Sequence, residues 1–232
     1  MDIQAIEKTG PNYSVEKLLD ARRKTTEAVL QIAERIKPGM LEEEARRVGD
    51  QTLRQLGSTQ GWHKTLVRFG SNTTKNYVDP SEPNVRLCDT DIFFVDIGPI
   101  WGDTEGDGGG TFVVGQEVDA DMKRCTVDVR RIFETVRRQW LASQLTGKEL
   151  YDFAIKAAAD LGWVLNLGLT GHRLSDYPHK AHYAGTLGST TVHPSPNLWI
   201  LEIQIRHPSK PFGGFFEDLL LGDELNRAES GH

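Results

Sequence analysis

Two acidic residues stand inside the most apolar segments of this chain, and they limit its fold more than any other feature. Asp96 lies in DIFFVDIGPI (residues 91–100), and Glu202 lies in LWILEIQI (residues 198–205). Runs of this composition are typical of buried strands. An ionised carboxylate in such a strand costs several kcal/mol unless a cation or hydrogen-bond donors compensate it. The fold must therefore bring compensating groups to both strands.

A second acid follows each of these strands. Asp107 comes in EGDGGGTF, 11 residues after Asp96, and Glu217 comes in GFFEDLLL, 15 residues after Glu202. Both separations are long enough for a hairpin that brings its two carboxylates together on one face. Four carboxylates around one centre repel one another, and two divalent cations cancel their charge. The sequence therefore predicts a site for two metal ions between two hairpins.

The segment GHRLSDYPH adds two histidines, His172 and His179, and its Gly171 and Pro178 favour a strand or loop over a helix. Mostly oxygen ligands with one imidazole favour Mn, Fe(II) or Co over a thiolate-bound zinc site, and zinc itself stays open. Each acid or histidine taken alone has a simpler explanation, as a buried group satisfied by hydrogen bonds or by an arginine. The metal hypothesis rests on the whole set.

The remaining patterns predict how these strands are packed. Apolar residues recur at helical spacing in residues 15–36, 41–56, 122–140 and 147–161, and Ser14 and the Thr146–Glu149 capping box mark two helix starts. The order is two helices and then strands, repeated once, with no linker near residue 117. This segregation predicts an α+β fold with antiparallel strands. We expect a single domain over residues 1–232, with halves at about 15–117 and 118–222.

Composition excludes other classes of protein. The chain has 232 residues, 38% of them hydrophobic, which suffices for a core and excludes disorder as the main state. A net charge of -6 argues against a nucleic-acid partner. No stretch has the roughly 18 apolar residues of a membrane span, and no secretion signal opens the chain. With only Cys88 and Cys125, no disulfide scaffold is expected, and we expect a cytoplasmic protein.

The acidic and histidine motifs together resemble a known family. VDIGP, EGD, TGH, a histidine seven residues further on, LE and FED occur in the order found in the pita-bread metallohydrolases. These include methionine aminopeptidases, aminopeptidase P, prolidase and creatinase, and the resemblance runs from the first helix to Leu221. It implies a pita-bread fold of two pseudo-symmetric halves. It implies five ligands for two divalent metal ions, of which Asp107 and Glu217 bridge: Asp96, Asp107, His172, Glu202 and Glu217.

The same resemblance implies roles in catalysis. Glu202 is expected to take the proton of the attacking water and pass it to the leaving nitrogen. His179 matches the family histidine that contacts the substrate or the oxyanion formed at its carbonyl. The family has one more histidine before the first ligand aspartate, and here Asn76 takes its place in TTKNYVDP. His63 in GWHKTLVRFG is a second candidate for this contact, so both are predicted substrate-binding residues. The alternatives are a surface or packing role for His63 and a turn position for Asn76.

Other departures concern the surroundings of the ligand set. Gly110 replaces the family's arginine before Thr-Phe, and Ile203 replaces the proline after the first ligand glutamate. We expect no N-terminal domain of the creatinase or prolidase type. A domain without that neighbour needs a second copy to wall its pocket, so a homodimer is expected.

The resemblance implies hydrolysis of an amide or peptide C–N bond, by an aminopeptidase or an Xaa-Pro peptidase. Its substrate is then a peptide. One alternative is a creatinase-like hydrolase of a small non-peptide amide or guanidino compound. Another is a non-catalytic pita-bread binding protein, which typically loses metal ligands, whereas this chain keeps all five.

Overall fold

Antiparallel strands form the centre of the computed structural model, which describes residues 2–58 and 60–222. Seven strands form one sheet, in the order β1 (Leu66–Phe69), β2 (Asp91–Ile97), β5 (Gly108–Val114), β9 (Gly213–Leu219), β8 (Trp199–Arg206) and β6 (Val164–Leu165), with β7 (His172–Arg173) also paired to β8. A separate pair, β3 (Ile100–Trp101) and β4 (Thr104–Glu105), lies between β2 and β5 in the chain.

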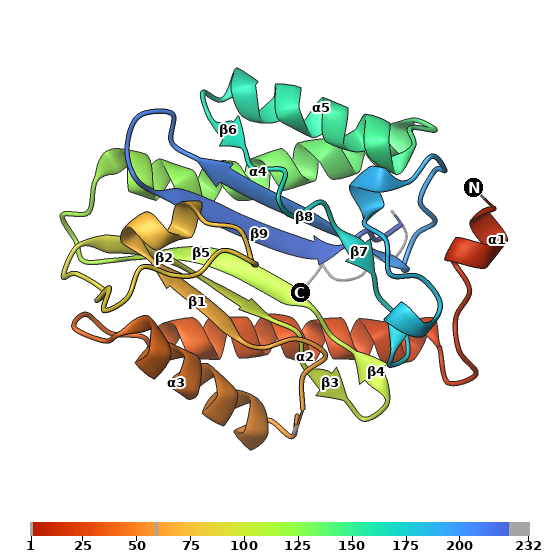
Figure 1. Ribbon diagram of the computed structural model, residues 1–232, viewed down its shortest axis with the longest axis horizontal. Helices are drawn as coiled ribbons and strands as arrows, with labels where there is room; N and C mark the ends of the chain where they lie inside the picture. Colours follow the sequence, from red (N-terminus) through yellow and green to blue (C-terminus); the bar gives the residue numbers. More distant parts are fainter. Residues whose placement is uncertain (1, 59, 223–232) are drawn as a thin grey trace.

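The helices lie in two pairs, as Figure 1 shows, with one short helix at the N-terminus. Their bounds are α1 (Ile3–Ile6), α2 (Val15–Arg35), α3 (Glu42–Gln55), α4 (Ala120–Ala142) and α5 (Gly147–Asp160), and three 3₁₀ turns are η1 (Gly70–Thr74), η2 (His179–Ala181) and η3 (Leu187–Ser189). Both predicted starts are confirmed. The Ser14 side chain accepts a hydrogen bond from the Lys17 N–H, and Thr146 and Glu149 form the capping box of α5.

Each pair of helices packs on its own part of the sheet. The first pair, α2 and α3, covers β1, β2 and β5, and the second pair, α4 and α5, covers β5, β9, β8 and β6. Two of the three apolar clusters of the described residues lie under these helix pairs. One contains Phe93, Val95 and Ile97 of β2, and the other contains Leu201 and Ile203 of β8. The α+β fold of two similar halves with antiparallel strands is therefore confirmed.

Strand alternation places the acids on the opposite face of the sheet. Because odd-numbered residues of β2 and β8 face the helices, Asp96 and Glu202 face away from them. The register continues this row across four strands, since Asp96 pairs with Gly109, Gly109 with Glu217, and Glu217 with Glu202. Directly paired residues of antiparallel strands share a face. Three acids from two halves therefore lie in one line.

The first hairpin differs from the simple one that the sequence predicted. The β3–β4 pair interrupts the connection from β2 to β5, and Asp107 lies just before β5 begins. Asp107 is therefore not the cross-strand partner of Asp96, whose partner Gly109 comes two residues later. A Cβ at Gly109 would meet the ring of Phe215 at 2.4 Å, so a side chain does not fit there. The fourth acid enters the site from the strand's end.

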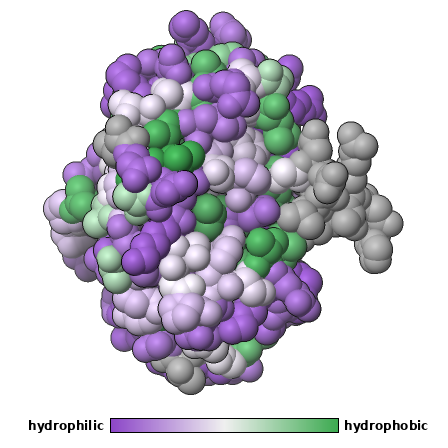
Figure 2. All heavy atoms as spheres, turned by 90° about the vertical axis from the view of Figure 1, so that its right-hand side faces the viewer, coloured by the Kyte–Doolittle hydropathy of each residue, from purple (hydrophilic) through white to green (hydrophobic). Residues whose placement is uncertain are grey.

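Across the described residues, no helix has the length and apolar character that crossing a membrane requires. On the face that Figure 2 shows, hydrophilic side chains predominate and hydrophobic ones form small, separate groups.

Candidate metal centre

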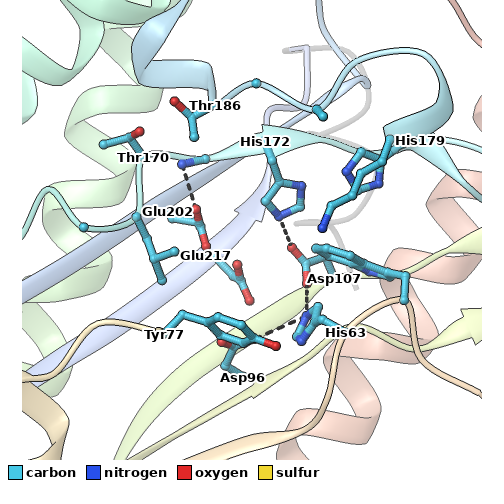
Figure 3. A pocket seen from close by; sticks show the side chains of 17 residues that line it. His63, Tyr77, Asp96, Asp107, Thr170, His172, His179, Thr186, Glu202 and Glu217 are labelled. Carbon is cyan, nitrogen blue, oxygen red and sulfur yellow. Dashed lines mark hydrogen bonds and ion pairs between the residues drawn. The ribbon is translucent and has the colours of Figure 1, made fainter. Parts of the chain in front are cut away.

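One cavity of about 360 Å³ receives side chains from both halves of the chain. All five predicted ligands line it, together with both predicted substrate-contacting histidines: Asp96, Asp107, His172, Glu202, Glu217, His63 and His179. Figure 3 shows the four carboxylates pointing into the same space, with the histidines on one side of it. The acids are nearly inaccessible, with exposed fractions of 3 to 6%. The structure thus brings together residues that are up to 154 positions apart, from His63 to Glu217.

Asp107 lies between two imidazole rings. Its Oδ1 is 3.1 Å from Nε2 of His63, and its Oδ2 is 2.8 Å from Nε2 of His172. Burial raises the pKa of Asp107, but the positive charges and hydrogen bonds of the two histidines outweigh it and lower the pKa to about 2. Burial alone would lower the pKa of His63 and of His172, but the negative charges of the neighbouring carboxylates outweigh it. The pKa of each ring therefore rises to about 9.

Asp96 has weaker compensation. Its Oδ1 lies 3.5 Å from Nε2 of His63, which is an ion pair but too long for a hydrogen bond. Burial raises the pKa of Asp96 to about 7, against the opposing charge of His63. Within the described residues, no lysine or arginine forms an ion pair with any of the four carboxylates. An arginine therefore does not account for these buried acids.

The two glutamates have still fewer partners. Glu202 accepts one hydrogen bond through Oε2, from the N–H of Gly171 at 2.7 Å. Burial raises the pKa of Glu202, and burial together with the negative charge of Asp107 raises the pKa of Glu217 well above its usual range. The Oε1 atom of Glu217 is buried without any hydrogen-bond partner among the described residues. An unpartnered buried carboxylate oxygen is rare and requires an explanation.

His179 lies against His172, with ring centroids 5.4 Å apart and nearly parallel planes. Glu105 fixes this ring, since its Oε2 is 2.6 Å from Nδ1 and its Oε1 accepts the backbone N–H at 3.0 Å. Burial lowers the pKa of His179. The neutral ring therefore carries its proton on Nδ1, toward Glu105, and presents Nε2 as a hydrogen-bond acceptor.

Besides Tyr77, which is described below, two residues around this site were not predicted from the sequence. Glu105 is 1% exposed, and its position in the acidic EGD segment was the available signal. Trp62 packs edge-on against three histidine rings, with centroid distances of 4.3, 4.8 and 5.1 Å to His63, His172 and His179. A tryptophan next to a histidine is by itself too common to indicate such a role.

Of the two predicted substrate-binding residues, the structure brings only His63 to the cavity. The side chain of Asn76 lies against Gly168 and does not line the cavity. Its neighbour Tyr77 takes that place, with its ring 5.7 Å from the ring of His63. Successive residues of the chain point in different directions, so a shift of one position decides which side chain faces the site.

The donor atoms fit divalent cations. Asp107, His172 and Glu217 each offer one ligand atom, and these atoms lie within 4.8 Å of one another. His63, Asp96 and Asp107 form a second group that meets the same limit. Carboxylate oxygens and imidazole nitrogens suit Mn, Fe, Co and Zn. Together with the unpartnered oxygen of Glu217, this donor set fits a pair of metal ions.

Solved structures with the same architecture are proteins of the pita-bread fold. A prolidase from Thermococcus sibiricus matches with a TM-score of 0.74 and 18% identity, over 94% of this chain and 58% of that one. An X-Pro aminopeptidase from Thermotoga maritima gives a TM-score of 0.71 and 19% identity, over 90% and 60%. A variant of Escherichia coli aminopeptidase P gives 0.72 and 18%, over 93% and 54%. At this identity the likeness establishes the fold, and the fold is pita-bread.

The sequence itself places the chain in a family. Residues 16–222 match the profile of metallopeptidase family M24, and the chain belongs to this family. The comparison with curated proteins returns no significant match. The chain spans less than two thirds of the length of the solved structures named above.

Proposed function

We propose that this chain carries the catalytic centre of a dinuclear metal-dependent hydrolase that cleaves the amide C–N bond of peptides. One observation carries the proposal: four buried carboxylates converge on one cavity, and histidines are their only ion-pair partners within the described residues. Membership of a metallopeptidase family supports it. Buried charges of one sign persist in folded proteins when they are paired or coordinate metals.

The geometry supports a specific distribution of ligands. Asp107, His172 and Glu217 are close enough to hold one ion, which we propose Glu202 also contacts. Asp96 and Asp107 would hold the other, and Glu217 would bridge with Asp107. When bound, such ions polarise a substrate carbonyl and lower the pKa of water toward neutrality. Asp107 is central because each of its oxygens faces a different histidine.

Glu202 and His179 are the proposed catalytic residues. The Gly171 N–H holds Oε2 of Glu202, which fixes the carboxylate while it accepts a proton from water and delivers it to the leaving nitrogen. Because Nδ1 of His179 is bonded to Glu105, its Nε2 is suited to accept a hydrogen bond from a substrate N–H. This argues for contact with the substrate's amide or amine, and against the oxyanion role.

A metal titration tests the centre before any substrate is known. Protein purified without chelator and then loaded with Mn(II) or Co(II) should bind two ions per chain. Asp107→Asn should bind neither tightly, whereas Asp103→Asn, at an exposed aspartate paired with Lys17, should bind both. A wild-type chain that folds but binds no divalent ion would contradict the proposed function and favour a binding protein.

For the substrate, we propose short peptides with proline in the second position. The solved structures with this fold include a prolidase and an X-Pro aminopeptidase, and a cavity of about 360 Å³ is at the small end for ligand sites. The metal-loaded protein should be assayed with Xaa-Pro dipeptides, longer Xaa-Pro peptides, peptides without proline, and small amides including creatine. Cleavage of creatine or small amides alone would instead establish the creatinase-like alternative.

Other parts of the proposal need their own measurements. We propose Mn(II), Co(II) or Fe(II) as the metal, with Zn(II) as the alternative, to be decided by metal analysis of the isolated protein. We propose a cytoplasmic location because Cys88 and Cys125 are both free thiols, which thiol labelling in cells can test. The homodimer, the absence of a nucleic-acid partner and the single-domain division stay predictions. Sedimentation of the purified protein tests the first of them.

A further inference from the structure

The segment that carries His63 is fixed to the chain just beyond Asp96. The Trp62 N–H donates to the carbonyl of Gly98 at 2.9 Å, and the Ile100 N–H donates to the carbonyl of Gln60 at 3.0 Å. Gly61 and Pro99 form an antiparallel bridge between these two bonds. The backbone before His63 therefore has a defined register relative to β2, and its side chain does not depend on a free loop for its position.

The ring of His63 occupies a space that only glycine leaves open. A Cβ at Gly98 would lie 2.1 Å from Cδ2 and 2.3 Å from Nε2 of His63. The indole of Trp62 packs edge-on against the ring from another side, and Tyr77 does so at a centroid distance of 5.7 Å. The side chain of His63 is 10% exposed. Packing thus holds the imidazole with one nitrogen directed at Asp96 and Asp107.

His63 repeats the arrangement of His172, the histidine already proposed as a ligand. In both, Nδ1 lies against the backbone carbonyl of the next residue, at 2.9 Å for His63 and 2.6 Å for His172. In both, Nε2 faces one oxygen of Asp107. A carbonyl that holds the Nδ1 proton leaves the lone pair on Nε2, which is how metal-ligating histidines are oriented.

The distances also fit one coordination sphere. Ligand atoms about 2.1 Å from an ion lie about 3.0 Å apart when they occupy adjacent octahedral positions. Nε2 of His63 is 3.1 Å from Oδ1 of Asp107 and 3.5 Å from Oδ1 of Asp96. One ligand atom from each of the three residues lies within 4.8 Å of the other two, which is close enough for all three to surround one ion. A histidine that contacts only substrate would not need to face both carboxylates.

We propose that His63 is a sixth protein ligand and binds the ion held by Asp96 and Asp107, so that each ion of the pair receives one imidazole. The inference rests on the proposed dinuclear centre and replaces the substrate-binding role predicted for His63 from the sequence. As a consequence, the site formed by Asp96 and Asp107 would include an imidazole nitrogen among its ligands. Such a site favours Co(II) and Zn(II) over Mn(II) more strongly than one built from carboxylates alone.

Proton NMR of the Co(II)-loaded protein tests this assignment directly. An imidazole bound to Co(II) through Nε2 shows a strongly shifted, exchangeable Nδ1–H signal, and the carbonyl bonds on both histidines slow its exchange. The wild-type protein with two Co(II) ions should show two such signals. His63→Ala should lose one, and His172→Ala should lose the other. His193→Ala is the matched control, because its Nδ1 also faces a backbone carbonyl but the residue does not line the cavity.

Metal affinity gives a second reading. His63→Ala should weaken one of the two Co(II) binding steps about 10- to 100-fold in a chelator competition and leave the other step nearly unchanged. Gly98→Ala should produce the same loss with His63 still present, because its methyl group displaces the ring. Circular dichroism shows whether each variant is folded, and if His63→Ala does not fold, His63→Gln replaces it.

The outcomes separate this inference from the proposed function. Two bound ions with a single shifted imidazole signal in the wild type, unchanged in His63→Ala, would overturn the inference and leave the dinuclear centre standing. No bound Co(II) at all would overturn both. Two signals, of which one disappears in His63→Ala and in Gly98→Ala, would establish the sixth ligand.

Discussion

The two halves of the sheet bring equal numbers of acids to the cavity but compensate them differently. Asp96 and Asp107, on the β2–β5 side, face imidazole rings at 2.8 to 3.5 Å. Glu202 and Glu217, on the β8–β9 side, pair directly across the strands and have one backbone N–H between them. Both acids of the first half therefore have imidazole partners in the protein, and of the two only Asp96 keeps a raised pKa. The second half needs protons or bound cations to compensate its acids. Metal binding and the stability of the folded chain are therefore coupled.

The largest effect is expected at Asp107, which joins the two halves. Asp107→Asn removes the charge that both histidines face and a ligand proposed for both ions. We expect the hydrolytic rate to fall about a thousandfold or more, equivalent to about 4 kcal/mol, because the lost ions supply several kcal/mol of charge stabilisation. Steady-state kinetics of the metal-loaded variant measures it. Activity within tenfold of wild type would show that the halves do not share a ligand here.

The pH dependence of stability should reveal the uncompensated charges. The pKa of Asp96 is raised from 3.8 to about 7, and that of His63 from 6.5 to about 9. A raised pKa gives stability that is complete below the unfolded value and is lost as pH rises through the folded value. Glu202 and Glu217, also raised, act in the same direction.

The metal-free protein should therefore melt several degrees lower at pH 9 than at pH 6. Added divalent metal should raise the melting temperature more at pH 9, since the ligands have then lost their protons. Thermal scans with and without chelator measure both effects. A metal-free protein that gains stability between pH 6 and pH 9 would contradict the charge balance derived above.

Glu105 links the halves in another way, because it lies in β4 and holds His179 of the second half. Glu105→Gln keeps the size of the side chain but removes the charge that holds the Nδ1 proton of His179. We expect kcat/KM to fall about tenfold, as for other groups that orient a functional histidine, with metal content unchanged. A drop in bound metal would place Glu105 in the metal centre instead of the positioning of His179.

The smallest effect is expected when one glutamate on the less compensated β8–β9 side is neutralised. Glu217→Gln resembles the protonated glutamate, so the metal-free variant should melt like wild type at pH 6. At pH 9 the variant should melt roughly 2 to 4 °C higher than the metal-free wild type at the same pH. This is the shift that about 1 kcal/mol produces in a chain of this size. Differential scanning calorimetry at both pH values measures it. A lower melting temperature at pH 9 would mean that the ionised Glu217 is stabilised by groups in the metal-free protein.

Most of the site could be predicted from the sequence because charged residues are unusual inside apolar strands. Asp96 and Glu202 stand out in apolar strands, and the capping box of α5 and the helix repeats mark the scaffold around them. The sequence did not locate Glu105, and it pointed to Asn76 where the cavity is lined by Tyr77. Neither decision is encoded in residue type alone, because an acidic turn and a polar loop are each compatible with many side-chain directions.

His63 shows the same limit most clearly. It precedes Asp96 by 33 residues in a segment without secondary structure, and only the backbone pairing with Gly98 and Ile100 brings it to Asp107. The sequence also predicted two simple hairpins, whereas the β3–β4 pair interrupts the first and leaves Gly109 opposite Asp96.

The residues by themselves determined that buried strands would carry charge, that two pairs of helices would cover them, and that the chain would match a metallopeptidase family. Burial energies and helical periodicity depend on residues that are close together in the chain, so they can be recognised in the sequence. The tertiary structure alone decided which side chains meet: the strand register that aligns Asp96, Glu217 and Glu202, and the short backbone bridge that delivers His63. Contacts between distant segments depend on register and packing, which a shift of one residue would change.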